Sequence, residues 1–250
     1  MVSNKLKLYY ELAWIWPMWG DPETEYAEYC NFIISKIRSV ANREMKTLLN
    51  IGCGGGKNIY TLKRYFITVG LDLSPEMLKH ASELNPECEF VCADMRTFDL
   101  NSKFDVVFID DAITYMTTRA DLQQVFKRAF AHLEPGGIMV VTPDVTLESF
   151  IQNYTQVFHS LKSDKYPQTE IVYITTDYSS NAESEKYETS FIYQIRTNGK
   201  LKIETEVHEF GLFSLQVWID LLKNAGYVIQ QESYKEGEHQ YSPFICVKPK

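Results

Sequence analysis

Strand-like apolar runs alternate with helix-like segments through the first 145 residues, and this alternation constrains the fold more than any other feature of the sequence. Repeated strand–helix–strand units place their strands side by side in a parallel sheet, so the pattern predicts the α/β class. The runs are almost continuously apolar, as expected for strands that are covered on both faces. We expect strands at Thr47–Ile51, Ile67–Leu71, Cys88–Cys92, Phe104–Ile109 and Ile138–Thr142.

Helices are expected in the intervals between these strands. One runs from Lys57 to about Tyr65, one over Pro75–Leu84 with Ser74 as its N-cap, and one over Arg119–His132. Ser at the cap and Pro at the first helical position are typical of a helix start. The Glu-Pro-Gly-Gly sequence at 134–137 predicts a turn before the fifth strand.

The pattern changes after the fifth strand. Residues 170–210 alternate apolar and polar side chains, with interruptions at 179–181 and 198–199, which predicts an antiparallel meander. Ser214–Ala225 then has the pattern of a capped amphipathic helix that stops at Gly226, and closing strands follow at Tyr227–Gln231 and Phe244–Val247. Because no linker or repeat interrupts the chain, we expect one domain over 1–250, with a core at 46–145, an insertion at 170–210 and a closing part at 211–250.

Composition excludes several classes of protein. A chain of 250 residues with 45% hydrophobic residues can bury a sizeable core. Its net charge of -8 argues against a surface for duplex nucleic acid or anionic membrane. No apolar run reaches the ~20 residues that cross a bilayer, and the five cysteines lack zinc-site spacing. We therefore expect a soluble, cytoplasmic protein with reduced thiols, no metal, and neither nucleic acid nor membrane as a partner.

A glycine-rich turn between the first strand and the first helix is the main candidate for ligand binding. Gly52, Gly54 and Gly56 allow the backbone to turn tightly and to approach a ligand closely. The spacing departs from the dinucleotide fingerprint, because Lys57 stands where the third glycine belongs. Asp72 ends the second strand, where a carboxylate can accept hydrogen bonds from a ribose diol.

Asp94 and Met95 close the third strand, where a carboxylate can accept a hydrogen bond from an adenine amino group while the thioether packs on the ring. With these residues the sequence resembles the class I S-adenosylmethionine-dependent methyltransferases. The resemblance covers about residues 45–145. Its motifs follow in the order of the family at 50–56, 70–78, 93–96, 104–107 and 133–137.

The resemblance implies a Rossmann-like seven-stranded methyltransferase sheet with helices on both faces, and S-adenosylmethionine as cofactor with S-adenosylhomocysteine as product. The glycine turn would wrap the methionine moiety, the acid after strand two would bind the ribose, and the end of strand four would lie near the cofactor. The implied cofactor residues are Asn50, Gly52, Gly54, Gly56, Asp72, Leu73, Asp94, Met95, Ile109 and Asp110. Asn50 departs from the family, which usually has an acid there; it keeps an acceptor oxygen and loses the charge.

The outer parts of the chain are similar to the small-molecule N-methyltransferases that act on nucleotide-linked amino sugars. The similarity rests on Tyr10-Glu11-Leu12, on the meander and on the Gly-Leu-Phe-Ser step at 211–214. It implies an N-terminal helical cap over 1–45, in which Tyr10 closes over the cofactor and Tyr26 reaches its methionine end. The arginine that those enzymes place between these two tyrosines is absent here, which weakens the case for a sugar-nucleotide substrate.

Methyl transfer to the acceptor requires few catalytic groups from the protein. Methyl transfer from a sulfonium is an in-line displacement, so alignment and exclusion of water do most of the work. A nitrogen acceptor must also lose a proton. Asp111 and Tyr115 after strand four, and Asp144 after strand five, are the candidate catalytic residues, because open sheets bind ligands at this edge. His208 shares a strand face with Glu204 and Glu206, and we expect that face to be solvated.

We therefore expect a methyltransferase that acts on a small molecule, at nitrogen, as a monomer or homodimer. An NAD(P)-dependent oxidoreductase and a non-catalytic S-adenosylmethionine-binding protein remain alternatives. DNA amino-methylation is disfavoured, because 110–113 reads Asp-Asp-Ala-Ile rather than the motif of that branch. Three of the four Trp lie between Trp14 and Trp19, and many Tyr and Phe lie in the cap and the meander. This distribution predicts a closed, mostly apolar acceptor chamber.

Overall fold

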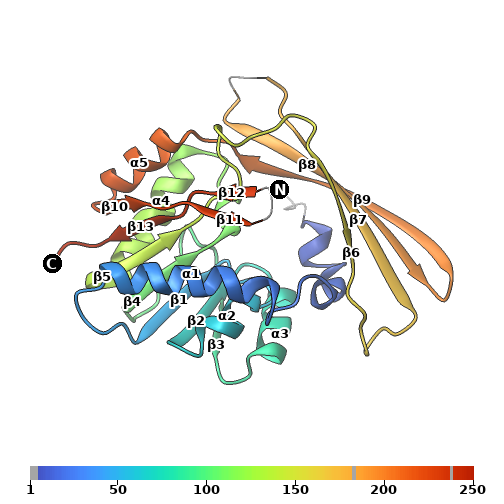
Figure 1. Ribbon diagram of the computed structural model, residues 1–250, viewed down its shortest axis with the longest axis horizontal. Coiled ribbons are helices and arrows are strands. Elements are labelled where there is room, and N and C mark those ends of the chain that lie inside the picture. The colour runs from blue at the N-terminus through green and yellow to red at the C-terminus, as the bar shows by residue number, and fades with distance from the viewer. Residues whose placement is uncertain (1–4, 182–183, 237–238) are drawn as a thin grey trace.

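A seven-stranded sheet forms the centre of the molecule in the computed structural model, which describes residues 5–181, 184–236 and 239–250 (Figure 1). The strand order is β10-β13-β5-β4-β1-β2-β3. The five strands β1 to β5 run parallel, whereas β13 is antiparallel to β5 and β10 is antiparallel to β13. This confirms the predicted α/β class and sheet. The bounds are β1 Thr47–Ile51, β2 Ile67–Asp72, β3 Glu89–Cys92, β4 Phe104–Ile109, β5 Leu133–Val141, β10 Val228–Gln231 and β13 Phe244–Val247.

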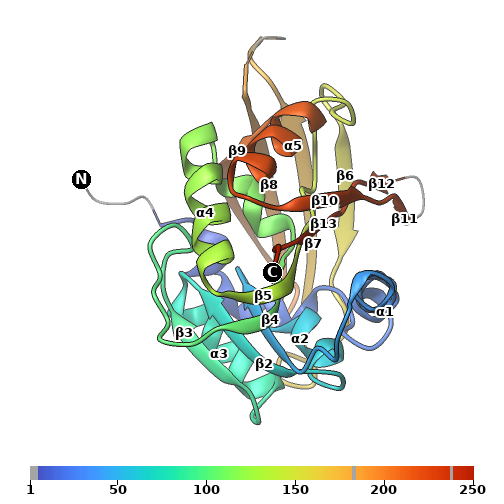
Figure 2. The same cartoon turned by 90° about the vertical axis from the view of Figure 1, so that its left-hand side faces the viewer.

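Helices cover both faces of this sheet, as Figure 2 shows for α4 and α1 on opposite sides. Successive residues of a strand point to opposite faces. Leu48 of β1 therefore packs in the layer of α1, whereas Leu49 packs in the layer of α4 and α5. The sheet is thus buried from both sides, which explains its continuous apolar runs. The helices are α1 Glu25–Val40, α2 Lys57–Leu62, α3 Pro75–Leu84, α4 Arg119–Ala131 and α5 Leu215–Asn224.

Side-chain caps fix the starts of three helices. The Ser74 hydroxyl accepts a hydrogen bond from the Met77 amide at the start of α3, and Ser214 does the same for the Val217 amide in α5. Thr118 caps α4 by accepting from the Asp121 amide. Each cap satisfies a backbone donor that has no partner within its helix, which is why the starts of α3, α4 and α5 agree with the sequence prediction.

The prediction of a turn at 134–137 is wrong. β5 begins earlier, at Leu133, and runs through the two glycines. Gly136 adopts a φ of 72°, and the pairing with β4 shifts between Phe104 and Val106. Lys248 holds the irregular stretch, since its carbonyl accepts from the Gly136 amide and its amide donates to the Gly137 carbonyl. The glycines therefore make a bulge within one strand and do not end it.

Four antiparallel strands form the insertion, in the order β6-β7-β8-β9. This confirms the meander and adds one strand before its expected start. Asn198 and Gly199, both with positive φ, make the two-residue turn between β8 and β9. The short hairpin of β11 and β12 was not predicted. The bounds are β6 Thr155–His159, β7 Thr169–Tyr178, β8 Lys186–Thr197, β9 Lys200–Gly211, β11 Tyr234–Glu236 and β12 His239–Tyr241.

The N-terminal segment lies between the central sheet and the insertion (Figure 1). Before α1 it contains two 3-10 helices, η1 Lys7–Tyr9 and η2 Ala13–Met18, so its first part is helical but not α-helical. Pro17 lies inside η2 and cannot donate a backbone hydrogen bond. Ile15 and Met18 are fully buried against Tyr193 and other inward-facing residues of the insertion. We call residues 5–40 the cap.

Candidate active site

The glycine turn follows β1 in a conformation that requires glycine. Gly52, Gly54 and Gly56 have φ values of 68°, 51° and 79°, a region that L side chains rarely adopt. A Cβ atom on Gly52 would lie 2.4 Å from the Ala112 Cβ atom. The turn therefore packs closely on Ala112 and under Trp16, at the carboxyl edge of the sheet where open sheets bind ligands.

Asp72, at the end of β2, holds this turn in place. Its two carboxylate oxygens accept hydrogen bonds from the Gly54 amide and the Ser74 amide, each at 2.8 Å. Burial raises the pKa of the carboxyl group, and the backbone donors oppose that effect. The carboxylate uses one lone pair on each oxygen here, which leaves acceptor capacity for a ribose diol.

The cap lies directly above Asp72. The Ser74 hydroxyl donates to the Tyr9 carbonyl, which ties η1 to the end of β2. Tyr10 is close enough to Asp72 for the carboxylate to raise the pKa of its phenol, after the larger effect of burial. The structure thus brings the expected lid residue beside the expected ribose acid, while the Leu73 side chain is exposed.

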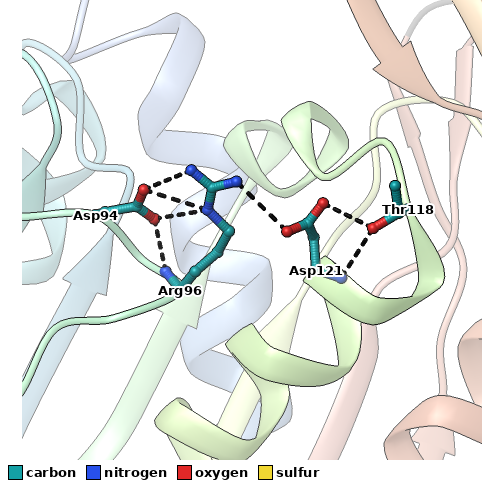
Figure 3. A network of polar contacts seen from close by, with 4 residues as sticks. All are labelled: Asp94, Arg96, Thr118 and Asp121. Atoms are coloured by element: carbon teal, nitrogen blue, oxygen red, sulfur yellow. Dashed lines mark hydrogen bonds and ion pairs between the residues drawn. The ribbon is translucent and has the colours of Figure 1, made fainter. Parts of the chain in front are cut away.

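Asp94 is engaged by a neighbouring arginine (Figure 3). Its carboxylate accepts from Arg96 Nη2 at 2.6 Å, from Nε and from the Arg96 amide, and Arg96 also reaches Asp121. The Arg96 guanidinium lowers the pKa of Asp94. An adenine amino group would share this carboxylate with Arg96, so the expected contact stays a prediction. Met95 lies beside the turn, with its Cε atom 3.4 Å from the position of a Cβ atom on Gly52.

Two of the expected cofactor residues are deeply buried. Ile109 belongs to the core between the sheet and α4. Asn50 is 1% exposed; its amide donates to the Phe108 carbonyl, and its Oδ1 atom has no hydrogen-bond partner among the described residues. A buried acceptor without a donor is costly in free energy. The Asn50 Oδ1 atom is the one that we expect to face the cofactor. The apolar sequence pattern alone does not reveal how deeply Asn50 and Ile109 are buried.

A cavity lies at the carboxyl ends of β4 and β5. It encloses about 590 Å³, part of it open to solvent, between α1, the ends of these strands and the β11–β12 hairpin. Four carboxylates and four tyrosines dominate its walls, and the closed, mostly apolar acceptor chamber stays a prediction. The lining residues are Glu25, Tyr26, Tyr29, Asp110, Asp111, Thr142, Asp144, Tyr234 and Tyr241.

The three aspartates of this cavity have raised pKa values. Loss of surrounding water within the cavity is the main cause at Asp110, Asp111 and Asp144, although Asp111 and Asp144 keep exposed surface, and the charge of Asp111 adds to it at the other two. Asn58 offsets part of the effect by donating to Asp110 at 2.9 Å. The pKa of Asp144 rises to about 7. A carboxyl group with this pKa can take up or release a proton near neutral pH.

Tyr115 belongs to a buried hydrogen-bond chain that joins three parts of the molecule. Its hydroxyl lies 2.6 Å from the Tyr9 hydroxyl and 2.7 Å from His208 Nδ1, and His208 Nε2 lies 3.1 Å from a Glu206 oxygen. His208 is 0% exposed, so the expectation of a solvated strand face is wrong. The cap covers this face of β9. The alternation of side chains along a strand separates its two faces but does not show which of them another segment covers.

Glu206 also anchors the cap to the insertion. Its carboxylate accepts from the Lys7 amide at 2.6 Å, the Leu8 amide at 2.9 Å and the Tyr193 hydroxyl at 2.8 Å. We call these contacts the Glu206 clamp. The sequence offered no signal for it, because two of the three donors are backbone amides almost 200 positions away.

Over residues 5–181, 184–236 and 239–250, no helix is both long and apolar enough to cross a membrane. The same ranges contain no group of three or more His, Cys, Asp or Glu side chains arranged to hold a metal ion.

Comparison with known proteins finds similarity to methyltransferases in the centre of the chain. Residues 48–137 match a family model described as a methyltransferase domain. The dTDP-3-amino-3,4,6-trideoxy-alpha-D-glucopyranose N,N-dimethyltransferase of Streptomyces venezuelae is 34% identical over 132 residues, which are 52% of this chain and 55% of that protein. A similar enzyme of Streptomyces fradiae is 32% identical over 143 residues, or 51% and 56%. The match thus spans about half the length of these relatives.

Solved structures match over almost the whole chain. DesVI of Streptomyces venezuelae has a TM-score of 0.79 at 25% identity and covers 96% of this chain and 97% of its own. The sugar N-methyltransferase KedS8 of a Streptoalloteichus species has a TM-score of 0.83 at 19% identity, with coverages of 100% and 96%. Residues 48–137 therefore match a methyltransferase domain, and the chain as a whole has the fold of these solved methyltransferases.

Proposed function

We propose that the protein transfers a methyl group from S-adenosylmethionine to a nitrogen atom of a small-molecule acceptor. The observation that carries the proposal is the position of the acidic cavity, which opens beside the glycine turn at the same edge of the sheet. An amine arrives as an ammonium ion at neutral pH, and carboxylates on the cavity wall attract it. The relatives in Streptomyces act on amino sugars by name, so nucleotide-linked amino sugars are the first acceptors to test.

The residues of the turn fit the cofactor. The glycines hold the turn in a backbone conformation that presents it to the edge of the sheet, under Trp16 of the cap. Asp72 keeps free lone pairs, and Asn50 holds an unpaired acceptor. When bound, the cofactor supplies an electrophilic methyl group. We assign its ribose to Asp72, its adenine to Asp94 and Met95, and its methionine end to the turn and Tyr26. Tyr10 closes over it.

The remaining residues prepare the acceptor. The nitrogen must lose its proton to free the lone pair that attacks the methyl carbon, while the carbon–sulfur bond breaks with its electrons on sulfur. We propose that Asp144 takes this proton, with Asp111 holding the ammonium form in place by charge. Tyr115, fixed by its hydrogen bond to His208, orients the acceptor. The tyrosines around them exclude water.

The wider setting of the protein follows from the same proposal. The partner is a small acceptor, without nucleic acid or membrane, and the net charge of -8 supports this. A cytoplasmic location and a monomeric or homodimeric state remain predictions.

Two measurements test the proposal. Thermal shift and calorimetry should show stabilisation by S-adenosylhomocysteine and none by NADH; the reverse would favour an oxidoreductase. Incubation with S-adenosylmethionine and a panel of dTDP-linked amino sugars, read by mass spectrometry, should yield N-methylated product. Tight cofactor binding without methylation of any amine in a broad panel would instead support a non-catalytic binding protein.

A further inference from the structure

Lys57 is a buried cation without a hydrogen-bonding partner. It is the first residue of α2, directly after the glycine turn, and it is 5% exposed. Its Nζ atom makes no hydrogen bond or ion pair with any residue in the described ranges. An ammonium group that has lost its water and gained no acceptor is costly, because three donors stay unsatisfied.

The atoms around the ammonium are mostly aromatic. The rings of Trp16 and Tyr26 have their centroids 5.3 Å from Nζ, and such rings attract a cation through their faces. The carboxylates of Glu25 and Asp21 act on Lys57 only from a distance, and burial lowers its pKa to about 8 in spite of them. The rings compensate part of the charge, but they provide no oxygen acceptor for the N–H groups.

The position of Lys57 links the two halves of the site. Trp16 lies on the glycine turn, since a Cβ atom on Gly55 would be 2.3 Å from its Cδ1 atom. Tyr26 lines the acidic cavity. The indole Nε1 of Trp16 is likewise a buried donor without a partner among the described residues. Two unpaired donors therefore lie between the turn and the cavity. Such a pair of donors is suited to bind an anion.

We propose that Lys57 binds the carboxylate at the amino-acid end of S-adenosylmethionine, with the Trp16 indole N–H as a second donor. The proposal rests on the proposed function, because it names the residue that reads one end of that cofactor. A carboxylate would supply acceptors to both donors, and charge-assisted hydrogen bonds of this kind are the strong ones. Since Nζ is sealed from solvent, the ligand reaches it only when the Trp16 or Tyr26 side chain moves.

The test compares two ligands that differ at this end. S-adenosylhomocysteine carries the amino-acid carboxylate, whereas 5'-methylthioadenosine keeps the adenosine and the thioether and lacks it. Calorimetry should show that Lys57→Met weakens S-adenosylhomocysteine binding about 10- to 100-fold and changes methylthioadenosine binding little. Lys57→Arg, which keeps the charge and the donors, should restore most of the preference. Lys63→Met is the matched control, because Lys63 follows α2 and pairs with Glu87 at 2.8 Å. It should change neither affinity.

The stability of the ligand-free protein gives a second readout. Lys57→Met removes an unpaired buried charge, so its melting temperature should rise by a few degrees while its affinity falls. A lysine that only supports the fold through the two rings predicts a lower melting temperature and equal loss for both ligands; either result overturns the assignment. Unchanged affinity for S-adenosylhomocysteine also overturns it. If the wild type binds neither ligand, the proposed function fails and the assignment falls with it.

Discussion

Replacing Asp72 separates two roles that the structure gives to one carboxylate. The side chain holds the glycine turn through the Gly54 and Ser74 amides, and we propose that it also binds the ribose of the cofactor. Asp72→Ala removes both backbone contacts at once. Asp72→Asn keeps the shape of the side chain but places an NH2 group against one of the two amides, so it loses at least one contact.

The contacts set the size of the effect. Hydrogen bonds to a charged group contribute about 1.5 to 3 kcal/mol each, and the cost of burying the carboxylate offsets part of the two that Asp72 makes to the backbone. We expect Asp72→Ala to lower the free energy of unfolding by about 2 kcal/mol, or roughly 4 to 8 °C in melting temperature. Loss of the ribose contacts should weaken S-adenosylhomocysteine binding by about 1.5 to 3 kcal/mol, roughly 10- to 150-fold.

Urea denaturation measures the first effect and calorimetry with S-adenosylhomocysteine measures the second. Asp99→Ala is the control, because the Asp99 side chain is 77% exposed and lies 3.6 Å from His132, away from the turn. If Asp72→Ala lowered stability and left the affinity unchanged, Asp72 would hold the turn without touching the ribose. If neither quantity changed, the reasoning from both hydrogen bonds would be refuted.

Three further substitutions test other parts of the site. Desolvation in the cavity raises the pKa of Asp144 to about 7 from an unfolded value of 3.8, so its charge opposes folding as the pH rises between these values. In urea denaturation, Asp144→Asn should match the stability of the wild type near pH 4 and exceed it at pH 8, by a margin that solvent at this exposed residue reduces. His208→Gln should lower the free energy of unfolding by about 1 to 3 kcal/mol, because it leaves the Tyr115 hydroxyl or the Glu206 carboxylate short of a buried partner. Equal denaturation midpoints for variant and wild type would count against this hydrogen-bond chain. Tyr10→Phe should weaken S-adenosylhomocysteine binding about three- to tenfold in calorimetry, and an unchanged affinity and turnover would end the lid assignment.

Local signals explain what the sequence predicted well. β1 has the expected bounds because it runs into the glycine turn, and β4 because its apolar run ends at Asp110. α3 begins at Pro75 because Ser74 caps it. The glycines of the turn were identifiable because only glycine tolerates their backbone conformation. In each case the deciding interaction lies within a few positions along the chain.

Long-range contacts explain what it missed. The burial of His208 depends on the cap, which packs on β9 from the far end of the sequence. Lys57 is an ordinary helix residue by pattern, and only the positions of Trp16 and Tyr26 make its ammonium unpaired. Asp144 and Asp111 were placed at the right edge, but their charges interact across the cavity. The sequence pattern alone does not show which residues from distant parts of the chain become neighbours.

The Glu206 clamp has a consequence for the order of folding. The backbone amide of Lys7 and the carboxylate that binds it are 199 positions apart, so all of the residues between them must leave the ribosome before the contact can form. β13, which completes the central sheet against β5, is made later still. Closing a loop of this length costs entropy that local contacts must first offset. The core at 46–145 can therefore collapse early. The cap cannot make its contacts with Glu206 until β9 has been synthesised.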